Sequence, residues 1–350
     1  RKTLKCPNGI VLGTPGSGKS FFAKREMANA FFATNDHILI LDPENEYTAL
    51  TEQLHGQTIY LAPDSHSYLN PMDLDLSTDV GESPMLMQAD FLLSQCELMM
   101  ASYGNPLMPI EKSLIDRCIS LVYRDYLKNP RPENMPVLGD LYQCLREQHN
   151  SRADDLATAM EIYVTGSLSY LNHRTNVDLN NRMVCYNTSK LGQGLKKLVM
   201  SNVQKHIWQR TAVNRYAGIT TRIFLDEFHL LLKEPQTAAY TAEIYKRFRK
   251  WNGIPTSLTQ NVKDLLDSSE IENILENSDF VLMLNQGASD RNILAQRLGI
   301  SPQELNHVTN SGEGEGLLFF GDKIIPFEDK FPRDTQLYRV MTTKPSDLAA

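Results

Sequence analysis

The sequence lacks the features that mark membrane-spanning, disulfide-stabilised and zinc-binding proteins. No apolar run approaches the ~20 residues that a membrane-spanning helix requires, and the first residues do not have the pattern of a signal peptide. The 5 cysteines are odd in number and scattered, without a Cys-x-x-Cys pair. This usage predicts neither a disulfide framework nor a zinc site, and a reducing cytosol fits it best.

The sequence also contains fewer positively charged than negatively charged residues. The 350 residues include 35 Lys and Arg against 42 Asp and Glu, which gives a formal net charge of −7 at pH 7. A uniformly basic surface for nucleic acid is therefore excluded, whereas a local basic channel is not. Because hydrophobic residues make up 41% and charged residues 22%, the chain can form a sizeable core, as one large domain or two smaller ones.

A phosphate-binding motif stands near the start of the chain. Residues 13–20, Gly-Thr-Pro-Gly-Ser-Gly-Lys-Ser, fit the P-loop pattern G-x-x-x-x-G-K-[ST]. Residues 9–12 are short and apolar, as in a buried strand, and apolar residues return at roughly helical spacing from Phe21 to Phe32. The loop thus lies between a predicted strand and a predicted helix, and this context argues against a chance glycine-rich turn.

The chemistry of a P-loop assigns roles to these residues. Glycines allow the backbone to wrap around phosphate oxygens, and the amino end of the following helix attracts the anion. Lys19 is predicted to bridge the β- and γ-phosphates of ATP, and Ser20 is predicted to bind Mg²⁺. The predicted nucleotide-binding residues are Gly13, Thr14, Pro15, Gly16, Ser17, Gly18, Lys19, Ser20 and Phe21.

A second motif completes the predicted ATPase site. Residues 222–227, Arg-Ile-Phe-Leu-Asp-Glu, form a short β-capable run that ends in two acidic residues. Asp226 is predicted to lie beside the Mg²⁺, and Glu227 to orient and deprotonate the attacking water. Acidic pairs at strand ends are common and often only solvated, but together with a P-loop this pair indicates a Walker B motif. We interpret the nearby His229 as structural.

A polar residue also follows the predicted strand 255–259. Gln260 would lie at the tip of the strand next to the Walker B strand, where it could contact the γ-phosphate or the attacking water. The alternative is that it simply caps a helix near residues 261–266. We favour the first interpretation and count Gln260 among the candidate catalytic residues.

The transition state of a P-loop ATPase needs positive charge, often from an arginine of a neighbouring subunit. Arg249 and Lys250, at the end of a basic helix, are the candidates for this role. Arg291 and Arg297, in a later predicted helix, are alternatives. For any one of these residues, a solvated basic helix face or a contact with nucleic acid explains the charge equally well.

The remaining pattern divides the chain into two regions. Short apolar strands are predicted at 37–41, 57–61, 183–186, 280–284 and 316–320, with helices between them. From about Thr78 to Leu171, strand signals disappear and amphipathic helices take over. The sequence therefore predicts an α/β core, residues 1–77 and 172–350, and an all-helical insertion lobe, residues 78–171. Four methionines in this lobe, at 85, 87, 99 and 100, fit core packing better than a partner surface.

Taken together, the motifs resemble the motor domain of the VirB-four/TraC-type ATPases of type IV secretion and conjugation systems. The resemblance follows the correct order over nearly the whole chain. It includes residues 13–20, Asp42-Pro43-Glu44-x-Glu46-Tyr47, Asn70-Pro71, Ser189-Lys190-Leu191, Leu225-Asp226-Glu227, Arg249-Lys250-x-x-Gly253 and Thr259-Gln260. It implies a RecA-like P-loop core of the HerA/FtsK group with a mainly parallel sheet, a helical insertion, and a ring that is usually hexameric.

The resemblance also implies a function. It predicts a Mg²⁺-dependent ATPase that energises pilus assembly and substrate transfer, in the cytoplasm and peripheral at the inner face of the cell membrane. Expected partners are ATP, other secretion-system components and further copies of the chain, with DNA possible. The family often has arginine where this chain has Asn45, and its large N-terminal domain is absent, so we interpret the chain as a fragment that assembles weakly.

Two other functions remain open. A HerA/FtsK-like DNA translocase would use the same chemistry on a different load, although the acidic net charge gives no support for strong DNA binding. A nucleotide-gated assembly scaffold would bind ATP without needing turnover. The presence of Glu227 argues against a pure scaffold, because a scaffold has no use for a catalytic base.

Overall fold

The structure is a computed structural model, and it describes residues 1–76, 83–101, 106–260, 262, 270–344 and 347. The chain forms two compact units. The first comprises Arg1–Thr58, Leu179–Asn187 and Val213–Ala350, and the second comprises Ile59–Asp178 and Thr188–Ala212. The expected lobe, residues 78–171, lies within the second unit, which extends beyond it at both ends.

A nine-stranded sheet, in the order β3-β4-β2-β5-β6-β1-β7-β8-β9, is formed by the described residues. The pairs that join β4, β2, β5, β6, β1 and β7 are parallel, whereas β8 and β9 add antiparallel strands after β7. The predicted α/β class with a mainly parallel sheet is confirmed. The strands are β1 Gly9–Leu12, β2 His37–Asp42, β3 Gln57–Tyr60, β4 Met183–Asn187, β5 Thr221–Leu225, β6 Gly253–Thr259, β7 Phe280–Met283, β8 Glu315–Phe320 and β9 Lys323–Glu328.

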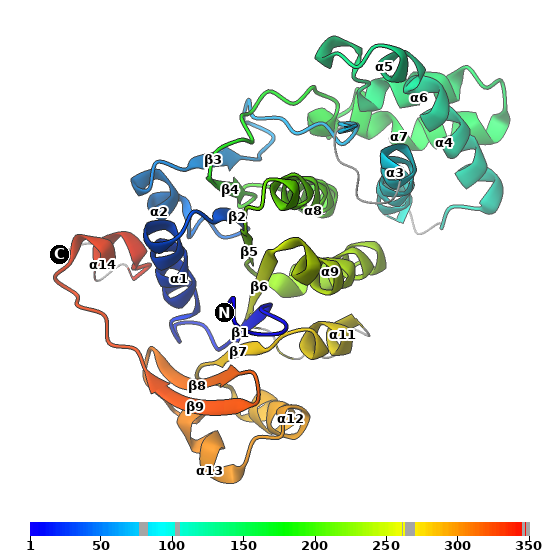
Figure 1. Cartoon of the computed structure of the whole chain (residues 1–350). Helices are drawn as coiled ribbons and strands as arrows, with labels where there is room; N and C mark the ends of the chain where they lie inside the picture. The colour runs from blue at the N-terminus through cyan, green and yellow to red at the C-terminus, as the bar shows by residue number, and fades with distance from the viewer. Residues whose placement is uncertain (77–82, 102–105, 261, 263–269, 345–346, 348–350) are drawn as a thin grey trace. The chain divides into compact units, whose positions relative to one another are not determined.

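The central strands are apolar on both faces because helices cover both sides of the sheet. Helices α1, α2 and α14 lie on one side in Figure 1, and α9 and α11 lie on the other. Since parallel strands share one carboxyl edge, the segments after β1, β2, β5 and β6 are brought to the same edge. The helices of the first unit are α1 Lys19–Ala33, α2 Thr48–Gln53, η3 Phe228–Leu232, α9 Pro235–Phe248, η4 Arg249–Trp251, α11 Glu270–Glu276, α12 Ala288–Leu298, α13 Pro302–Leu305, η5 Asn306–Val308 and α14 Gln336–Met341.

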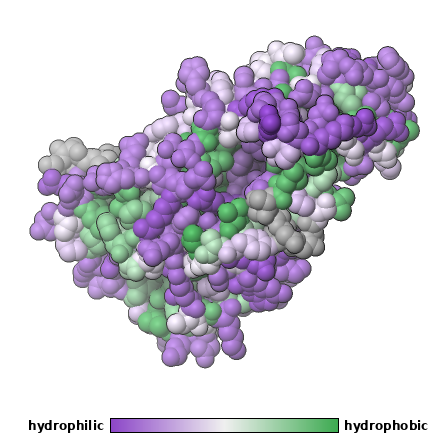
Figure 2. All heavy atoms as spheres, turned by 45° about the horizontal axis from the view of Figure 1, so that its top comes forward, coloured by the Kyte–Doolittle hydropathy of each residue, from purple (hydrophilic) through white to green (hydrophobic). Residues whose placement is uncertain are grey.

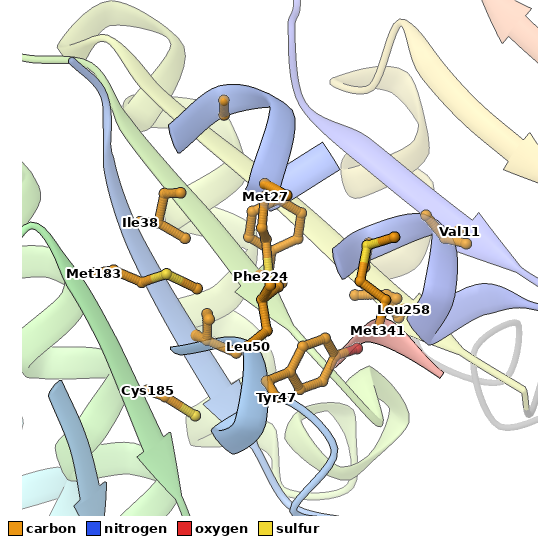
Figure 3. Packing of buried hydrophobic residues seen from close by; sticks show 14 of the residues in the cluster. Val11, Met27, Ile38, Tyr47, Leu50, Met183, Cys185, Phe224, Leu258 and Met341 are labelled. Carbon is orange, nitrogen blue, oxygen red and sulfur yellow. The ribbon is translucent and has the colours of Figure 1, made fainter. Parts of the chain in front are cut away.

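The core of the first unit joins segments from both ends of the chain. Met27 of α1, Leu50 of α2 and Met341 of α14 pack with strand residues such as Phe224 and Leu258 (Figure 3). All five side chains are fully buried, and burial of such a side chain contributes about 1.5–3 kcal/mol. Helix α14 is therefore anchored to the core, although no pattern in the sequence predicted it.

The second unit is helical between residues 83 and 171, as far as the structure describes this range. One stripe of α4, including Leu114, Ile115, Cys118 and Ile119, is buried, as its helical spacing requires. Of the four methionines, those at 99 and 100 are buried and those at 85 and 87 are partly buried. Its helices are α3 Pro84–Ala101, α4 Pro109–Val122, α5 Arg124–Lys128, η1 Pro132–Asn134, α6 Leu138–Arg146, α7 Ser151–Val164, η2 Ser169–Leu171 and most of α8 Gln193–Tyr216.

This unit is wider than residues 78–171 because hydrogen bonds join the segments before and after the helical stretch to each other, and the second of them to the stretch itself. The Lys205 Nζ of α8 donates to the carbonyl oxygen of Pro71 at 2.8 Å, and the Asn202 amide donates to that of Leu69 at 2.9 Å. The Gln95 amide of α3 in turn donates to the carbonyl of Leu198. Loss of strand pattern alone could not reveal these bonds.

The molecular surface is dominated by polar residues on the face shown in Figure 2, where hydrophobic residues gather only in smaller areas. Among the described residues, the structure contains no helix that combines the length and the apolar character needed to cross a membrane.

Candidate active site

The P-loop connects β1 to α1 in a conformation that its glycines permit. Gly16 has a φ of 76° and Gly18 has a φ of 101°, backbone angles that residues other than glycine rarely adopt. Gly13 is needed for a different reason, because a Cβ there would lie 2.4 Å from the Ser17 Oγ. Gly18 caps α1 without a side-chain hydrogen bond, so the first N–H groups of the helix remain available to an anion.

Lys19 is folded against its own loop. The residue is 8% exposed, and its Nζ donates to the carbonyl oxygens of Gly13 at 2.7 Å and Thr14 at 3.1 Å. Burial lowers the pKa of the lysine, while Glu227 and Asp226 act to raise it. The ammonium group is therefore held at the phosphate-binding loop and close to a cluster of carboxylates.

That cluster is built by the ends of neighbouring strands. Asp226 follows β5 and is 4% exposed, and burial raises its pKa to about 8, with the nearby Glu46 as the next cause. The backbone N–H of Glu227 donates to the Asp226 Oδ1 at 2.9 Å. Glu227 itself has a φ of 46°, a positive value that is strained for this residue type.

A divalent cation fits this set of donors. Ser20 and Asp226 line one cavity, and hydroxyl and carboxylate oxygens are hard ligands of the kind Mg²⁺ prefers. The raised pKa of Asp226 shows that the cluster favours added positive charge. The described residues contain no group of three or more His, Cys, Asp or Glu arranged to hold a metal.

The structure connects Gln260 directly to Glu227. The Gln260 Nε2 donates to the Glu227 Oε1 at 2.9 Å, and both residues line the cavity. The His229 Nδ1 lies 3.1 Å from the Glu227 Oε2, yet neither atom has a hydrogen-bond partner among the described residues. His229, for which we expected only a structural role, thus lies against the candidate base. The helix expected at 261–266 falls outside the described residues except for Val262.

Glu46, an acidic residue in the loop after β2, lies at the site but had no predicted role. The Asp42 carboxylate accepts hydrogen bonds from the N–H groups of Glu44, Glu46 and Tyr47, which fixes the loop after β2. Glu46 lines the cavity, and its Oε2 is buried without a hydrogen-bond partner among the described residues. Its position at the carboxyl end of a predicted strand was the available signal.

The cavity has a volume of about 780 Å³ and extends well beyond the motifs. Of the predicted nucleotide-binding residues, its lining includes Pro15, Gly16, Gly18, Lys19, Ser20 and Phe21, while Gly13, Thr14 and Ser17 shape the loop behind them. Much of the remaining lining comes from residues 313–315 and 327–344, which no motif identified. Sequence reasoning missed this part because only tertiary packing returns it to the P-loop.

The candidate arginine residues do not line this cavity. Arg249 and Lys250 are exposed and precede β6, so they lie at the amino edge of the sheet, opposite the P-loop. The Arg249 Nη1 donates to the Cys6 Sγ at 3.2 Å. Arg291 lies in α12 and is also outside the lining, and Arg297 of the same helix pairs with Glu272. None of the four contributes to the cavity of its own chain.

Comparisons with known proteins agree with this geometry. A family model described as the TraG P-loop domain matches residues 1–311. The structure is similar to VirB4 of Thermoanaerobacter pseudethanolicus, with a TM-score of 0.82 and 23% identity, covering 97% of this chain and 90% of that chain. No significant match was found among curated proteins.

More distant similarity is found to conjugative coupling proteins. The bacterial coupling protein TrwBdeltaN70 has a TM-score of 0.62 and 15% identity, covering 93% of this chain and 86% of that chain. The plasmid coupling protein TrwB in complex with ADP and Mg²⁺ has a TM-score of 0.63 and 14% identity, covering 95% and 88%. At these identities the structural matches concern the fold, and the predicted RecA-like P-loop fold is confirmed.

Proposed function

Because the chain belongs to the TraG P-loop domain family, we propose that it is the ATP-hydrolysing motor of a type IV secretion or conjugation machine. The membership confirms the predicted relationship to the P-loop ATPases of these systems. One observation carries the proposal of hydrolysis. Lys19, Asp226 and Glu227 meet at one cavity, where Gln260 donates a hydrogen bond to Glu227. A protein that only bound nucleotide would not need a carboxylate held in this way.

Each residue has a place in the proposed reaction. The P-loop N–H groups, the amino end of α1 and Lys19 bind the β- and γ-phosphates. Ser20 and Asp226 hold Mg²⁺, which neutralises charge on the phosphates when it is bound. Glu227 accepts a proton from the attacking water as its oxygen bonds to the γ-phosphorus and the bond to the bridging oxygen of ADP breaks. Gln260 keeps the Glu227 carboxylate in position.

The assembly is also part of the proposal. Arg249, with Lys250 as its neighbour, is exposed at the edge of the sheet away from its own cavity, so it can act only on the ATP of another subunit. A ring, which we propose to be hexameric, provides that neighbour. We place the motor in the cytoplasm at the inner face of the membrane, where it meets other components of the secretion system.

ATP turnover with and without Mg²⁺ tests the proposal. Lys19→Ala is expected to weaken ATP binding because it removes a phosphate contact. Glu227→Gln is expected to keep binding but lose about 10²–10⁴ in kcat, because the base is neutralised while its shape remains. Turnover of Glu227→Gln at the level of the unsubstituted protein would rule out the assigned base.

The same assay distinguishes the proposed secretion motor from the two alternatives, a DNA translocase and a nucleotide-gated scaffold. Turnover that is stimulated by DNA, with a steep dependence on salt, would favour a DNA translocase instead. Tight Mg²⁺-dependent ATP binding without any turnover in an assembled sample would favour a nucleotide-gated scaffold. The oligomeric mass is measured alongside, because an unassembled motor is expected to turn over slowly.

A further inference from the structure

The cavity lining includes two chemically different groups of residues. We call the region around Lys19 and Asp226, which the proposed function assigns to the phosphates and the metal, the phosphate end. Three neighbouring aromatic side chains, Phe21, Phe331 and Tyr338, also line the cavity and define what we call the aromatic end, although charged residues of the same C-terminal segment, such as Lys330, belong to the lining as well. A volume of about 780 Å³ lies within the range of ~300–1,000 Å³ found for small-molecule sites, so the cavity is large enough for more than a triphosphate.

The aromatic side chains come from distant parts of the sequence. Phe21 lies in the first turn of α1, directly after Ser20, and its ring centroid is 5.8 Å from that of Phe331 and 5.4 Å from that of Tyr338. The ring planes meet at 71° and 53°, so the rings do not stack face to face. All three side chains are only partly buried, so aromatic surface remains available to a planar ligand.

We propose that residues 327–344, the C-terminal segment, form with Phe21 the subsite for the base and ribose of the bound nucleotide. This inference rests on the proposed function, since it takes nucleotide binding by the P-loop as given. A nucleotide is the ligand whose two halves match the two ends, because its triphosphate is anionic and its base is a flat aromatic ring. Arg333 and Thr343, which belong to the same segment, also line the cavity and offer donors and acceptors to the base edge and the ribose hydroxyls.

The segment is held in place by contacts with α1 and with the core. Figure 1 shows the chain leaving β9 and running to α14, which lies on the same side of the sheet as α1. Near its start, Asp329 pairs with Arg25 of α1, and the Arg25 guanidinium lies 5.4 Å from the centroid of the Phe331 ring. Near its end, the fully buried Met341 accepts a hydrogen bond at its carbonyl oxygen from the Lys24 Nζ at 3.0 Å.

A further contact links this region to the P-loop itself. The N–H of Gly314 donates to the Ser17 carbonyl at 3.3 Å, and the N–H of Asp329 donates to the Gly314 carbonyl at 2.8 Å. The phosphate end and the aromatic end are thus parts of one hydrogen-bonded framework.

The test compares Mg²⁺·ATP with Mg²⁺·inorganic triphosphate, which has the phosphates but no base. Equilibrium dissociation constants are measured by calorimetry for the full chain and for Phe331→Leu, which keeps an apolar side chain but removes the ring. We expect ATP affinity to fall between about 5-fold and 100-fold, the range for loss of one base-stacking contact, with triphosphate affinity unchanged. Phe331→Tyr is expected to restore ATP affinity.

The matched control is Phe32→Leu, because Phe32 lies in the same helix as Phe21, is 69% exposed and does not line the cavity. This variant should leave both affinities unchanged. Thermal unfolding of each variant checks that the fold is retained. If Phe331→Leu fails to fold, Tyr338→Leu serves as the second variant, because the Tyr338 ring also lies beside Phe21.

The outcomes separate this inference from the proposed function. An equal loss for ATP and triphosphate, no loss for either, or tighter ATP binding by Phe331→Leu would each overturn the base subsite. If the unsubstituted chain binds ATP and triphosphate equally, and Lys19→Ala weakens both, the P-loop function stands and the subsite fails. If the chain binds neither ligand, the proposed function itself fails.

Discussion

At the scale of single residues, the site depends on how Glu227 is held. Its positive φ costs on the order of 1–3 kcal/mol, and the surrounding structure must offset that strain. Two contacts do so, the hydrogen bond from its own N–H to Asp226 and the bond that it accepts from Gln260. The strained backbone and the Gln260 amide together aim the carboxylate into the cavity.

Gln260 is therefore expected to act through Glu227 rather than on the substrate. Gln260→Ala should lower kcat by about 10- to 100-fold with little change in the affinity for ATP, because only the orientation of the base is lost. Gln260→Glu should in addition move the acidic limb of the pH–rate profile to higher pH, since a second carboxylate raises the pKa of the first. A profile that does not move in Gln260→Glu would contradict this role.

The residues of the site differ in how readily they could be predicted. Lys19 belongs to a recognisable motif, Asp226, Glu227 and Gln260 follow predicted strands directly, and parallel strands bring their carboxyl ends to one edge. Glu46 had the same position, but the sequence does not show which of several loop carboxylates turns toward the cavity. The contact of His229 with Glu227 depends on the turn after β5, which no pattern revealed.

At the scale of elements, α14 illustrates what sequence patterns miss. It is a helix of only 6 residues, too short for a clear periodic signal, and it follows a stretch with no predicted structure. Its importance comes from one buried side chain, Met341, and from the Lys24 hydrogen bond to the same residue. These are long-range contacts, and a single sequence does not encode them in any local pattern.

Met341 is expected to stabilise the first unit substantially. Met341→Ala should lower the free energy of unfolding by about 2–5 kcal/mol, as loss of a fully buried side chain leaves a cavity. Arg339→Ala is the control, because Arg339 is exposed in the same helix and should change stability by less than ~0.5 kcal/mol. Trp251 fluorescence in a Trp208→Phe background reports this unit during urea unfolding. A loss as small as that of the control would show that α14 is not anchored.

In the second unit, helix α8 contains an unusual lysine. The Lys205 Nζ is buried and donates to the carbonyl oxygens of Pro71 and Asp73 at 2.8 and 2.6 Å. Burial lowers its pKa to about 7, with the charge of Asp73 acting in the opposite direction. The unfolded chain, in which a lysine titrates near 10.5, therefore binds more protons than the folded unit between these two values.

This difference predicts a pH dependence of stability. The free energy of unfolding should increase as the pH is raised from about 7 toward 9, by at most ~1.4 kcal/mol per pH unit for one proton, and the gain should be lost as the pH falls back through 7. Trp208 fluorescence in a Trp251→Phe background reports the second unit. Lys205→Met should remove most of the slope. The neighbouring His206 cannot produce it, because burial lowers its pKa to about 3. An unchanged slope in Lys205→Met would refute the assignment.

At the scale of the whole molecule, the α/β core was predictable because its strands alternate with helices in a regular order. The limits of the second unit were not, since they follow from side-chain hydrogen bonds of α8 rather than from a change in pattern. The position of Arg249 belongs to this scale as well. It precedes β6, and the 7 residues of that strand span about 23 Å at roughly 3.3 Å per residue before Gln260 is reached.

An arginine side chain cannot cross that distance, so Arg249 cannot serve the ATP bound to its own chain. It is exposed at the amino edge of the sheet, where a neighbouring subunit's cavity can meet it in a ring. In the proposed mechanism Lys19 binds the phosphates from within the same chain, and the missing contribution is positive charge on the departing γ-phosphoryl group. In well-studied systems, such an arginine increases kcat by a factor on the order of 10³–10⁵. In a weakly assembled chain the increase should be smaller.

Mixing two inactive variants tests whether Arg249 acts on a neighbour. Arg249→Ala keeps its own P-loop and Glu227, whereas Glu227→Gln keeps its own Arg249. Under assembling conditions, the mixture should regain ATP turnover that neither variant shows alone, because some interfaces then join an intact site to an intact arginine. Full activity of Arg249→Ala by itself would exclude the role. Without rescue in a sample whose co-assembly is shown by its mass, the trans role of Arg249 would be rejected, and Lys250, Arg291 and Arg297 would be tested in its place.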